Sequence, residues 1–246
     1  MKDNDKLTVC FGECAEQDAQ AIAKRVGAPL SDTLGPDLTL LVDSSGVSLV
    51  GYGMTYRGDF EKMLKRITDG RLKHEMLVHV SKTDIAQPTA IDATAGMGED
   101  SFLLAAAGYQ VTMFEQNPVI EVLLKDAMKR AKKHPLLSEI IDRMNLIGGN
   151  SIELLPKQNH ADLIYLDPMF PARRKSGLVN KKLQLIQHLE QPCVEEADLL
   201  QAAMSLNPRK IIIKRPLKGA FLADRKPQYS VKGKAIRYDC FVFAAK

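Results

Sequence analysis

The sequence predicts an α/β protein in which a small N-terminal α/β subdomain precedes a doubly wound, mostly parallel sheet. The main observation is that, from Thr89 onward, short apolar segments alternate with segments of helical periodicity, as in a series of βαβ units. A second observation is that Pro88 breaks the chain just before this alternation begins. We therefore expect two units, residues 1–70 and residues 71–246. The length of 246 residues and the 45% hydrophobic content suit a globular protein of this kind.

The N-terminal unit shows a short pattern of strands and helices. We expect a strand over 7–12, a helix over 19–27 that ends at Gly27, and two strands over 39–53 around a Ser-Ser-Gly turn. An amphipathic segment over 60–67 and a further helix over 71–82 complete the region before Pro88.

In the larger unit, predicted strands alternate with predicted helices. We expect its strands at 89–94, 109–115, 144–149, 161–168, 209–216 and 235–243. Helices are expected over 99–108, from Asn117-Pro118 to about 133, in a short stretch that Asn150 or Ser151 caps, and over 181–190 and 194–205. In such a sheet, ligands bind beyond the carboxyl ends of the strands.

Several classes of protein are disfavoured by composition. No stretch of about 18 apolar residues occurs, so we expect no transmembrane helix. The first residues, MKDNDKLTVCFGEC, lack the apolar core of a signal peptide, and we expect a cytoplasmic protein. The cysteines are therefore expected to be reduced thiols. We predict no metal site, because neither the cysteines nor the histidines form a pair at metal-binding spacing.

The first candidate ligand-binding segment is the loop Asp92-Ala-Thr-Ala-Gly96-Met-Gly98-Glu99-Asp100, which follows a predicted strand and begins a predicted helix. Its glycines allow a sharp turn and a close approach to a ligand. The third glycine of the dinucleotide-binding pattern is missing, and the acidic residues would repel a pyrophosphate. This loop therefore favours a cationic nucleoside such as S-adenosylmethionine over a nicotinamide dinucleotide.

Glu115 gives a second indication. It ends the next predicted strand, 17 residues after Gly98. A carboxylate at this place in nucleotide-binding sheets accepts hydrogen bonds from ribose hydroxyls. Its distance from the glycine loop makes Glu115 a candidate ribose ligand.

The segment Asp167-Pro168-Met169-Phe170-Pro171 follows directly on a buried strand. Asp167 and the carbonyl group of Pro168 can each accept an N–H bond from an exocyclic base amine, which is otherwise a poor nucleophile. Those bonds would aim the nitrogen lone pair at a methyl donor, so that catalysis rests on orientation and electrostatics. Phe170 could stack on an extruded base. We therefore take Asp167, Pro168 and Phe170 as candidate catalytic residues.

The order of these motifs resembles that of class I S-adenosylmethionine-dependent methyltransferases, and Asp-Pro-Met-Phe is similar to the Asp/Asn-Pro-Pro-aromatic motif of enzymes that methylate amino groups of nucleic acids. Met169 departs from the second proline of that motif. A closer resemblance is to the bacterial small-subunit ribosomal RNA methyltransferase J family, which modifies guanine N2 in 16S RNA. The matching stretches are GRLKHE, DATAGMGEDSFLLA, FEQNPVIEVLL, LDPMFPARRKSGLVNKK and IIIKRP.

This resemblance implies a seven-stranded sheet, S-adenosylmethionine as cofactor and 16S ribosomal RNA or the small ribosomal subunit as partner. It also implies cofactor contacts at Glu99, Asp100, Glu115, Gln116, Asn150, Ser151 and Asp167, beside those that the glycine loop suggests at Asp92, Gly96 and Gly98. Adenine-N6 or cytosine-N4 methylation of RNA or DNA remains an alternative, because the pocket motif does not distinguish these amines. A non-catalytic RNA-binding module is a second alternative.

Positive charge is concentrated in the C-terminal third. Residues 168–246 hold 16 Lys and Arg against 6 Asp and Glu, whereas residues 1–167 hold 18 against 24. Such asymmetry is typical of proteins that contact a polyanion. We expect RNA contacts at residues in two basic clusters and at the end of a strand: Arg173, Arg174, Lys175, Lys181, Lys182, Lys214 and Arg215.

Overall fold

The computed structural model describes residues 6–13, 15–168, 185–186, 189 and 195–243. The predictions for Phe170, for both basic clusters and for most of the helix over 181–190 therefore lie outside the described residues. Cys10 and Cys240, which are described, are free and buried, as expected. Among the described helices, none combines the length and the apolar character needed to span a membrane.

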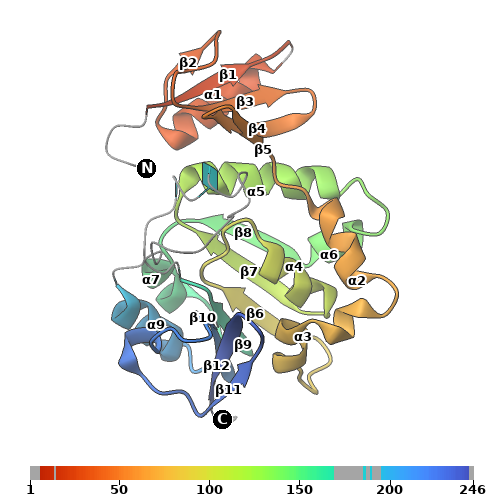
Figure 1. Cartoon of the computed structure of the whole chain (residues 1–246), viewed down its shortest axis with the longest axis vertical. Helices are drawn as coiled ribbons and strands as arrows, with labels where there is room; N and C mark the ends of the chain where they lie inside the picture. The colour runs from red at the N-terminus through yellow and green to blue at the C-terminus, as the bar shows by residue number, and fades with distance from the viewer. Residues whose placement is uncertain (1–5, 14, 169–184, 187–188, 190–194, 244–246) are drawn as a thin grey trace.

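The larger sheet has seven strands in the order β11-β12-β10-β9-β6-β7-β8 (Figure 1). Their bounds are β6 Thr89–Asp92, β7 Gln110–Glu115, β8 Met144–Gly148, β9 Leu163–Leu166, β10 Lys210–Pro216, β11 Tyr229–Lys232 and β12 Ile236–Val242. The five strands from β10 to β8 are parallel, and β12 runs antiparallel to both of its neighbours. The predicted mostly parallel, seven-stranded sheet is confirmed. Strand order reverses at β6, whose neighbours β7 and β9 lie on opposite sides.

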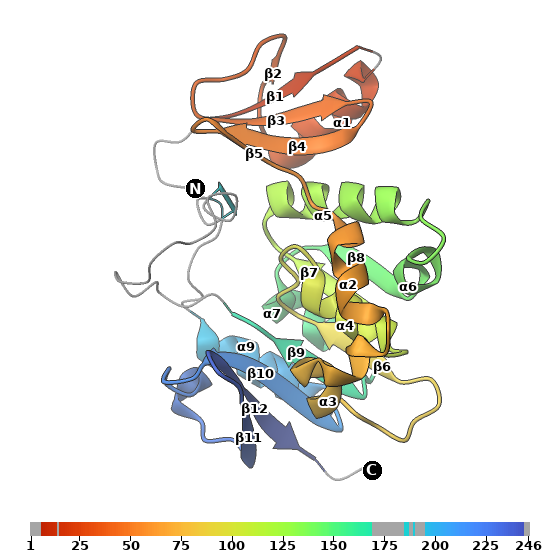
Figure 2. The same cartoon turned by 45° about the vertical axis from the view of Figure 1, so that its right-hand side comes forward.

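Helices cover both faces of this sheet, which makes it doubly wound (Figure 2). One face packs against α4 Glu99–Ala106, α5 Pro118–Ala131, α6 Ser138–Asp142 and α3 Met76–Val80. The other face packs against α7 Ser151–Leu154, η3 Leu155–Lys157, α9 Glu196–Ser205 and η4 Leu222–Asp224. Because strands such as β9 are covered on both faces, they are apolar along their whole length.

The smaller sheet has the strand order β2-β1-β3-β4-β5. Its elements are β1 Leu7–Phe11, α1 Glu16–Val26, β2 Leu30–Ser31, β3 Leu38–Asp43, β4 Gly46–Gly51 and β5 Met54–Tyr56. An apolar cluster joins this sheet to α5, which thus lies between the two sheets (Figure 1). A methyl group at Gly46, the first residue of β4, would lie 2.7 Å from a carboxylate oxygen of Asp126 on α5. The small unit therefore packs closely on the larger one.

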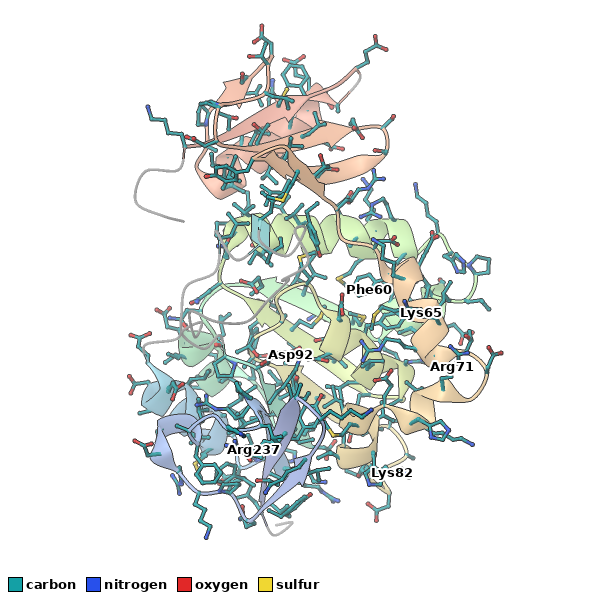
Figure 3. The ribbon with its side chains drawn as sticks, viewed as in Figure 1. Phe60, Lys65, Arg71, Lys82, Asp92 and Arg237 are labelled. Carbon is teal, nitrogen blue, oxygen red and sulfur yellow. The ribbon has the colours of Figure 1, made fainter. Side chains whose placement is uncertain are left out.

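Four short helices connect the two sheets. They are η1 Phe60–Met63, α2 Leu64–Ile67, η2 Arg71–His74 and α3. The single helix expected over 71–82 is wrong, because Glu75 has extended backbone angles and divides it. Lys65, Arg71 and Lys82 are exposed along this connection (Figure 3). The division at residue 70 stays a prediction.

Candidate active site

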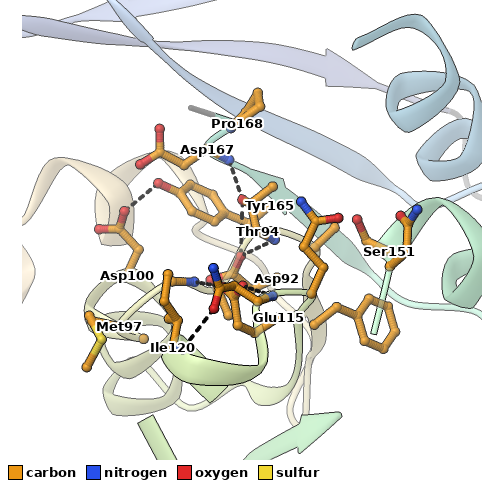
Figure 4. A pocket seen from close by; sticks show the side chains of 18 of the residues that line it. Asp92, Thr94, Met97, Asp100, Glu115, Ile120, Ser151, Tyr165, Asp167 and Pro168 are labelled. Carbon is orange, nitrogen blue, oxygen red and sulfur yellow. Dashed lines mark hydrogen bonds between the residues drawn. The ribbon is translucent and has the colours of Figure 1, made fainter. Parts of the chain in front are cut away.

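A cavity of about 870 Å³ lies at the carboxyl ends of the central strands (Figure 4). It is placed beside the switch in strand order at β6, where doubly wound sheets bind ligands. The cavity brings together the residues that the sequence predicted as cofactor contacts, from four separate segments: Asp92, Gly96, Gly98, Glu99, Asp100, Glu115, Gln116, Asn150, Ser151 and Asp167. Pro168 and Lys214 also line it.

The loop between β6 and α4 forms one wall, and its glycines have the backbone geometry that their type permits. Gly96 and Gly98 have φ angles of 52° and 75°, in the left-handed region. A side chain at Gly98 would meet Leu124 at 2.8 Å, whereas one at Gly96 would meet no atom within 4 Å. Gly98 thus allows close packing on α5, while Gly96 leaves its side of the wall open.

Asp92 is buried at the end of β6 and anchors this loop. One oxygen accepts a hydrogen bond from the Thr94 amide at 3.0 Å, and the other accepts one from the Ser101 hydroxyl at 2.5 Å. Burial raises the pKa of Asp92 to about 7, with Asp100 and Asp167 adding to the effect. A positive charge placed in the cavity would favour the ionised form of this carboxyl group.

Glu115 ends β7 and links three segments around the cavity. Its two oxygens accept hydrogen bonds from the amides of Gly96 at 2.9 Å and Asn117 at 2.7 Å, and its own carbonyl accepts one from Gly149 at 2.8 Å. The side chain is thereby held in one orientation. Each carboxylate oxygen can accept more than one hydrogen bond, so these contacts leave acceptor capacity for a ligand.

The wall opposite the glycine loop comes from the end of β8. Asn150, rather than Ser151, caps α7, because its side-chain oxygen accepts a hydrogen bond from the Ile152 amide at 3.0 Å. Gln116 lies on the neighbouring strand end and also faces the cavity. These residues contribute neutral polar groups, in contrast to the acidic wall formed by the first loop.

A charged network crosses the cavity between β9, β10 and α4. The Lys214 ammonium contacts Asp100 at 2.7 Å and Asp167 at 2.9 Å, and the Tyr165 hydroxyl donates to the same oxygen of Asp100 at 2.6 Å. The backbone amide of Asp167 donates to the Thr94 hydroxyl at 2.6 Å. Burial raises the pKa of Asp167, and the Lys214 ammonium opposes that rise. The two carboxylates are thus held together by one cation.

Two residues expected to contact RNA lie elsewhere than predicted. Lys214 points into the cavity, toward Asp100 and Asp167. Arg215 is 3% exposed, and its guanidinium donates to Glu196 at 3.1 Å and to the Ala220 carbonyl at 2.9 Å. The pattern Lys-Arg-Pro at a strand end indicated surface charge, but the acidic partners come from distant segments that the pattern does not reveal. We therefore withdraw Arg215 as a phosphate contact.

Some of the lining residues were not predicted from sequence, among them Tyr56, Thr94 and Tyr165. Tyr165 lies in an apolar strand and is typical of a core residue, although its hydroxyl reaches Asp100. Tyr56 belongs to β5 of the smaller sheet, so the N-terminal unit contributes to the cavity. Among the described residues, no group of three or more His, Cys, Asp or Glu side chains could hold a metal ion.

Comparisons with known proteins agree with this geometry. The family model SAM_MT, which describes S-adenosylmethionine-dependent methyltransferases, matches residues 53–243. The chain is 34% identical to a ribosomal RNA small subunit methyltransferase J from Thioalkalivibrio sulfidiphilus, with 94% of both chains covered. It is 35% identical to a protein of the same name from Pseudomonas aeruginosa, with 93% of this chain and 91% of that one covered. A crystal structure of an S-adenosylmethionine-dependent methyltransferase from Neisseria gonorrhoeae is similar, with a TM-score of 0.76, 29% identity and 97% of each chain covered.

Proposed function

Because this chain belongs to the ribosomal RNA small subunit methyltransferase J family, we propose that it methylates the exocyclic N2 amine of a guanine in 16S ribosomal RNA. The methyl donor is S-adenosylmethionine, as in the family of methyltransferases whose model matches the chain. Family membership also argues against the alternative of a non-catalytic RNA-binding module. With ribosomal RNA as its substrate, the enzyme would act in the cytoplasm.

The residues of the cavity fit this cofactor. The described lining contains one cation, Lys214, which is already paired, and six acidic residues: Asp92, Glu99, Asp100, Glu115, Asp167 and Glu195. Such a lining suits a ligand that carries a positive charge and no phosphate. The open side of Gly96 and the fixed carboxylate of Glu115 suit a nucleoside.

We assign the cofactor contacts by position. Glu115 would accept hydrogen bonds from the ribose hydroxyls, and Gln116, Asn150 and Ser151 would contact the base end of the nucleoside. The glycine loop, with Asp92, Glu99 and Asp100, would face the amino-acid end. When bound, S-adenosylmethionine supplies a methyl group on a sulfonium, which makes the carbon electrophilic.

Asp167 and Pro168 would prepare the target amine. The carboxylate and the proline carbonyl each accept one N–H, which draws the nitrogen out of conjugation with the ring and directs its lone pair. Thr94 and Lys214 fix the backbone amide and the side chain of Asp167, at 2.6 Å and 2.9 Å, so the acceptor is oriented before the substrate arrives. Phe170, which lies outside the described residues, would stack on the base.

The observation that carries this proposal is the position of Asp167-Pro168, at a strand end in the same cavity as the glycine loop and Glu115. The test incubates the protein with radiolabelled S-adenosylmethionine and, separately, with 16S RNA, small subunits, 23S RNA and DNA. We expect label in 16S RNA, free or assembled, and N2-methylguanosine in its nuclease digest.

Mass spectrometry of the labelled nucleosides distinguishes the remaining candidates. N6-methyladenosine or N4-methylcytidine would replace the guanine assignment with the alternative, while leaving the amine mechanism intact. Mapping of ribosomal RNA from cells that lack the protein gives an independent result, since one methylated guanine should be lost. An unchanged methylation map would overturn the ribosomal assignment.

A further inference from the structure

We propose that Lys214 is a positioning residue for methyl transfer, whose ammonium group holds the Asp167 carboxylate in its charged form and in a fixed orientation. This inference rests on the proposed function, since it concerns how Asp167 is prepared to accept an N–H from the base amine. It replaces the expectation that Lys214 contacts RNA phosphate.

The geometry gives Lys214 a task inside the cavity. It extends from β10 and reaches Asp100 on α4 at 2.7 Å and Asp167 after β9 at 2.9 Å. Its side chain is 25% exposed, so most of it is removed from water. To contact Lys214, an RNA phosphate would have to displace both carboxylates, which would cost free energy. A partly buried ion pair has less screening by solvent and salt than a surface pair.

Electrostatics explains why a cation is needed here. Asp167 and Asp100 share one cation, so without it two like charges would lie close together and one carboxyl group would tend to protonate. Burial lowers the pKa of Lys214, but the Asp100 and Asp167 carboxylates outweigh this effect and raise it, so the ammonium stays charged. A protonated Asp167 would lose acceptor strength toward the amine. Lys214 therefore lowers the pKa of Asp167 against the effect of burial and favours its charged form.

Other charged and titratable groups also surround Asp167, from each element packed around it. The neighbouring groups are Asp100 on α4, Asp92 on β6, Tyr165 on β9, Arg215 on β10 and Tyr238 on β12. Burial raises the pKa of Tyr165 well above its usual range, so this hydroxyl stays protonated and donates to Asp100. Arg215 also lowers the pKa of Asp167, but less than Lys214 does, and its guanidinium is bound to Glu196 and to the Ala220 carbonyl. Lys214 is therefore the cation with the larger effect on Asp167.

The test compares the pH dependence of single-turnover methylation in the wild type, Lys214→Met, Lys214→Arg and Lys218→Met. Lys218 is an exposed lysine four residues further on and serves as the matched control. With cofactor saturating, we expect Lys214→Met to shift the acid limb of the rate by about one pH unit or more to higher pH. Its rate should fall about tenfold near pH 7 and recover near pH 9. Lys214→Arg and Lys218→Met should keep the wild-type profile.

A second substitution predicts a shift of opposite sign. Asp100→Asn leaves Lys214 to Asp167 alone, so the acid limb should move to lower pH. If thermal unfolding shows that Lys214→Met does not fold, Asp100→Asn still tests the electrostatic coupling between Lys214 and Asp167. A purely structural role would change the rate equally at all pH values and would overturn the inference.

The phosphate role gives a different pattern. If Lys214 contacts RNA, Lys214→Met raises the KM for RNA and flattens its salt dependence, with the pH profile unchanged. Failure of the proposed function is separate, because the wild-type protein would then leave guanine N2 of 16S RNA unmethylated. In that case carbon-13 NMR of the Asp167 carboxyl group decides: its titration midpoint should rise in Lys214→Met, and an unchanged midpoint would contradict the inference.

Discussion

Asp92 and Asp167 face one cavity but have different partners. Asp92 accepts hydrogen bonds from a backbone amide and a hydroxyl, whereas Asp167 is paired with the Lys214 ammonium. A neutral donor stabilises a buried carboxylate less than a cation does. We therefore expect Asp167 to act as a charged acceptor toward substrate, and Asp92 to depend on whether a cation occupies the cavity.

The charge of Asp167 can be tested directly. Asp167→Asn keeps the shape and one acceptor oxygen but removes the charge, so turnover should fall by about 10²-fold or more, as for the loss of one preorganised electrostatic contact. Cofactor and RNA affinity should remain near wild type. Asp198→Asn, an exposed change on α9, is the matched control. A wild-type rate for Asp167→Asn in single turnover would mean that this segment is only a turn.

The pKa of Asp92 predicts how stability depends on pH. Its folded-state pKa of about 7 lies above the ordinary value of 3.8, so the folded state binds the proton more tightly than the unfolded state. Stability from this group is therefore present at low pH and is lost as pH rises from about 4 to about 7. In Asp92→Asn the amide oxygen can still accept from the Thr94 amide and the amide nitrogen can donate to the Ser101 hydroxyl oxygen, so the substitution should remove this loss.

The measurement is urea unfolding of cofactor-free wild type and Asp92→Asn at several pH values. The stability advantage of Asn should grow between pH 4 and pH 7, reach at most about 4 kcal/mol, and stay constant above pH 7. Saturating S-adenosylmethionine should reduce the advantage, since a cation favours ionised Asp92. A difference that does not vary with pH would show that Asp92 is ionised in the folded protein without a ligand.

At the scale of elements, the loop between β6 and α4 contains two left-handed glycines with different surroundings. Gly98→Ala combines left-handed strain with a contact 2.8 Å from Leu124, whereas Gly96→Ala has only the strain. We expect about 1–2 kcal/mol of destabilisation for Gly96→Ala and about 1–3 kcal/mol more for Gly98→Ala.

A third glycine provides the control for both. Gly27, which ends α1, is also left-handed, and a methyl group added there would meet no atom within 4 Å, but this residue lies away from the cavity. Gly27→Ala should therefore match Gly96→Ala in urea unfolding. Calorimetry should show weaker cofactor binding for Gly96→Ala and not for Gly27→Ala. Equal stability of all three variants would mean that the loop relaxes around Gly98.

The elements that sequence predicted well are those whose signal is local. The central strands appear as apolar runs, and Asn117-Pro118 indicated the start of α5, where the Asn117 side chain accepts hydrogen bonds from two amides. The strands that were missed are short or lie at an edge: β2, β5 and β11. Their pairing depends on neighbours that a local pattern does not contain. The break at Glu75 was missed for a similar reason, because its carboxylate is paired with Arg66 across a turn.

The candidate site likewise contains residues that a local sequence pattern predicts and residues that depend on distant parts of the chain. The residues of the glycine loop, the acidic strand end and Asp167 follow a known order of motifs, so their gathering in one cavity could be predicted. The position of Lys214 could not, because its partners lie 114 and 47 residues earlier in the chain. Tyr56 enters the cavity only because the small sheet packs on α5, which is a property of tertiary structure.

For the whole molecule, charge is divided between an acidic cavity and a basic C-terminal third. The cavity suits a cationic cofactor, and the basic segments 173–175 and 181–182 follow Asp167 directly in the chain. Because these segments follow Asp167 so closely in the chain, we expect them to contact phosphates of an RNA whose base enters the cavity. With 6% aromatic residues and no tryptophan, phosphate contact is a better expectation than an extended stacking surface.

The salt dependence of RNA binding tests this arrangement. Arg173, Arg174 and Lys175 changed together to Ala should raise the KM for RNA and reduce the slope of log affinity against log salt by about 2–3, since each lost phosphate contact removes about 0.7–0.9. Affinity for S-adenosylmethionine should not change. The control replaces three exposed lysines of a different part of the surface, Lys125 and Lys129 on α5 and Lys133 just beyond it.

The control removes the same net charge from the molecule, so it separates local contact from general attraction. If RNA is attracted only by the net charge of the protein, both triple substitutions should weaken RNA binding equally at low salt, and both affinities should approach that of the wild type at high salt. If residues 173–175 contact phosphates, only the variant of these residues should show a smaller slope of log affinity against log salt. Its methylation rate at saturating RNA should stay near wild type. A wild-type slope in that variant would assign these charges to solvent and leave RNA recognition to other surfaces, among which the exposed Lys65, Arg71 and Lys82 would be tested next.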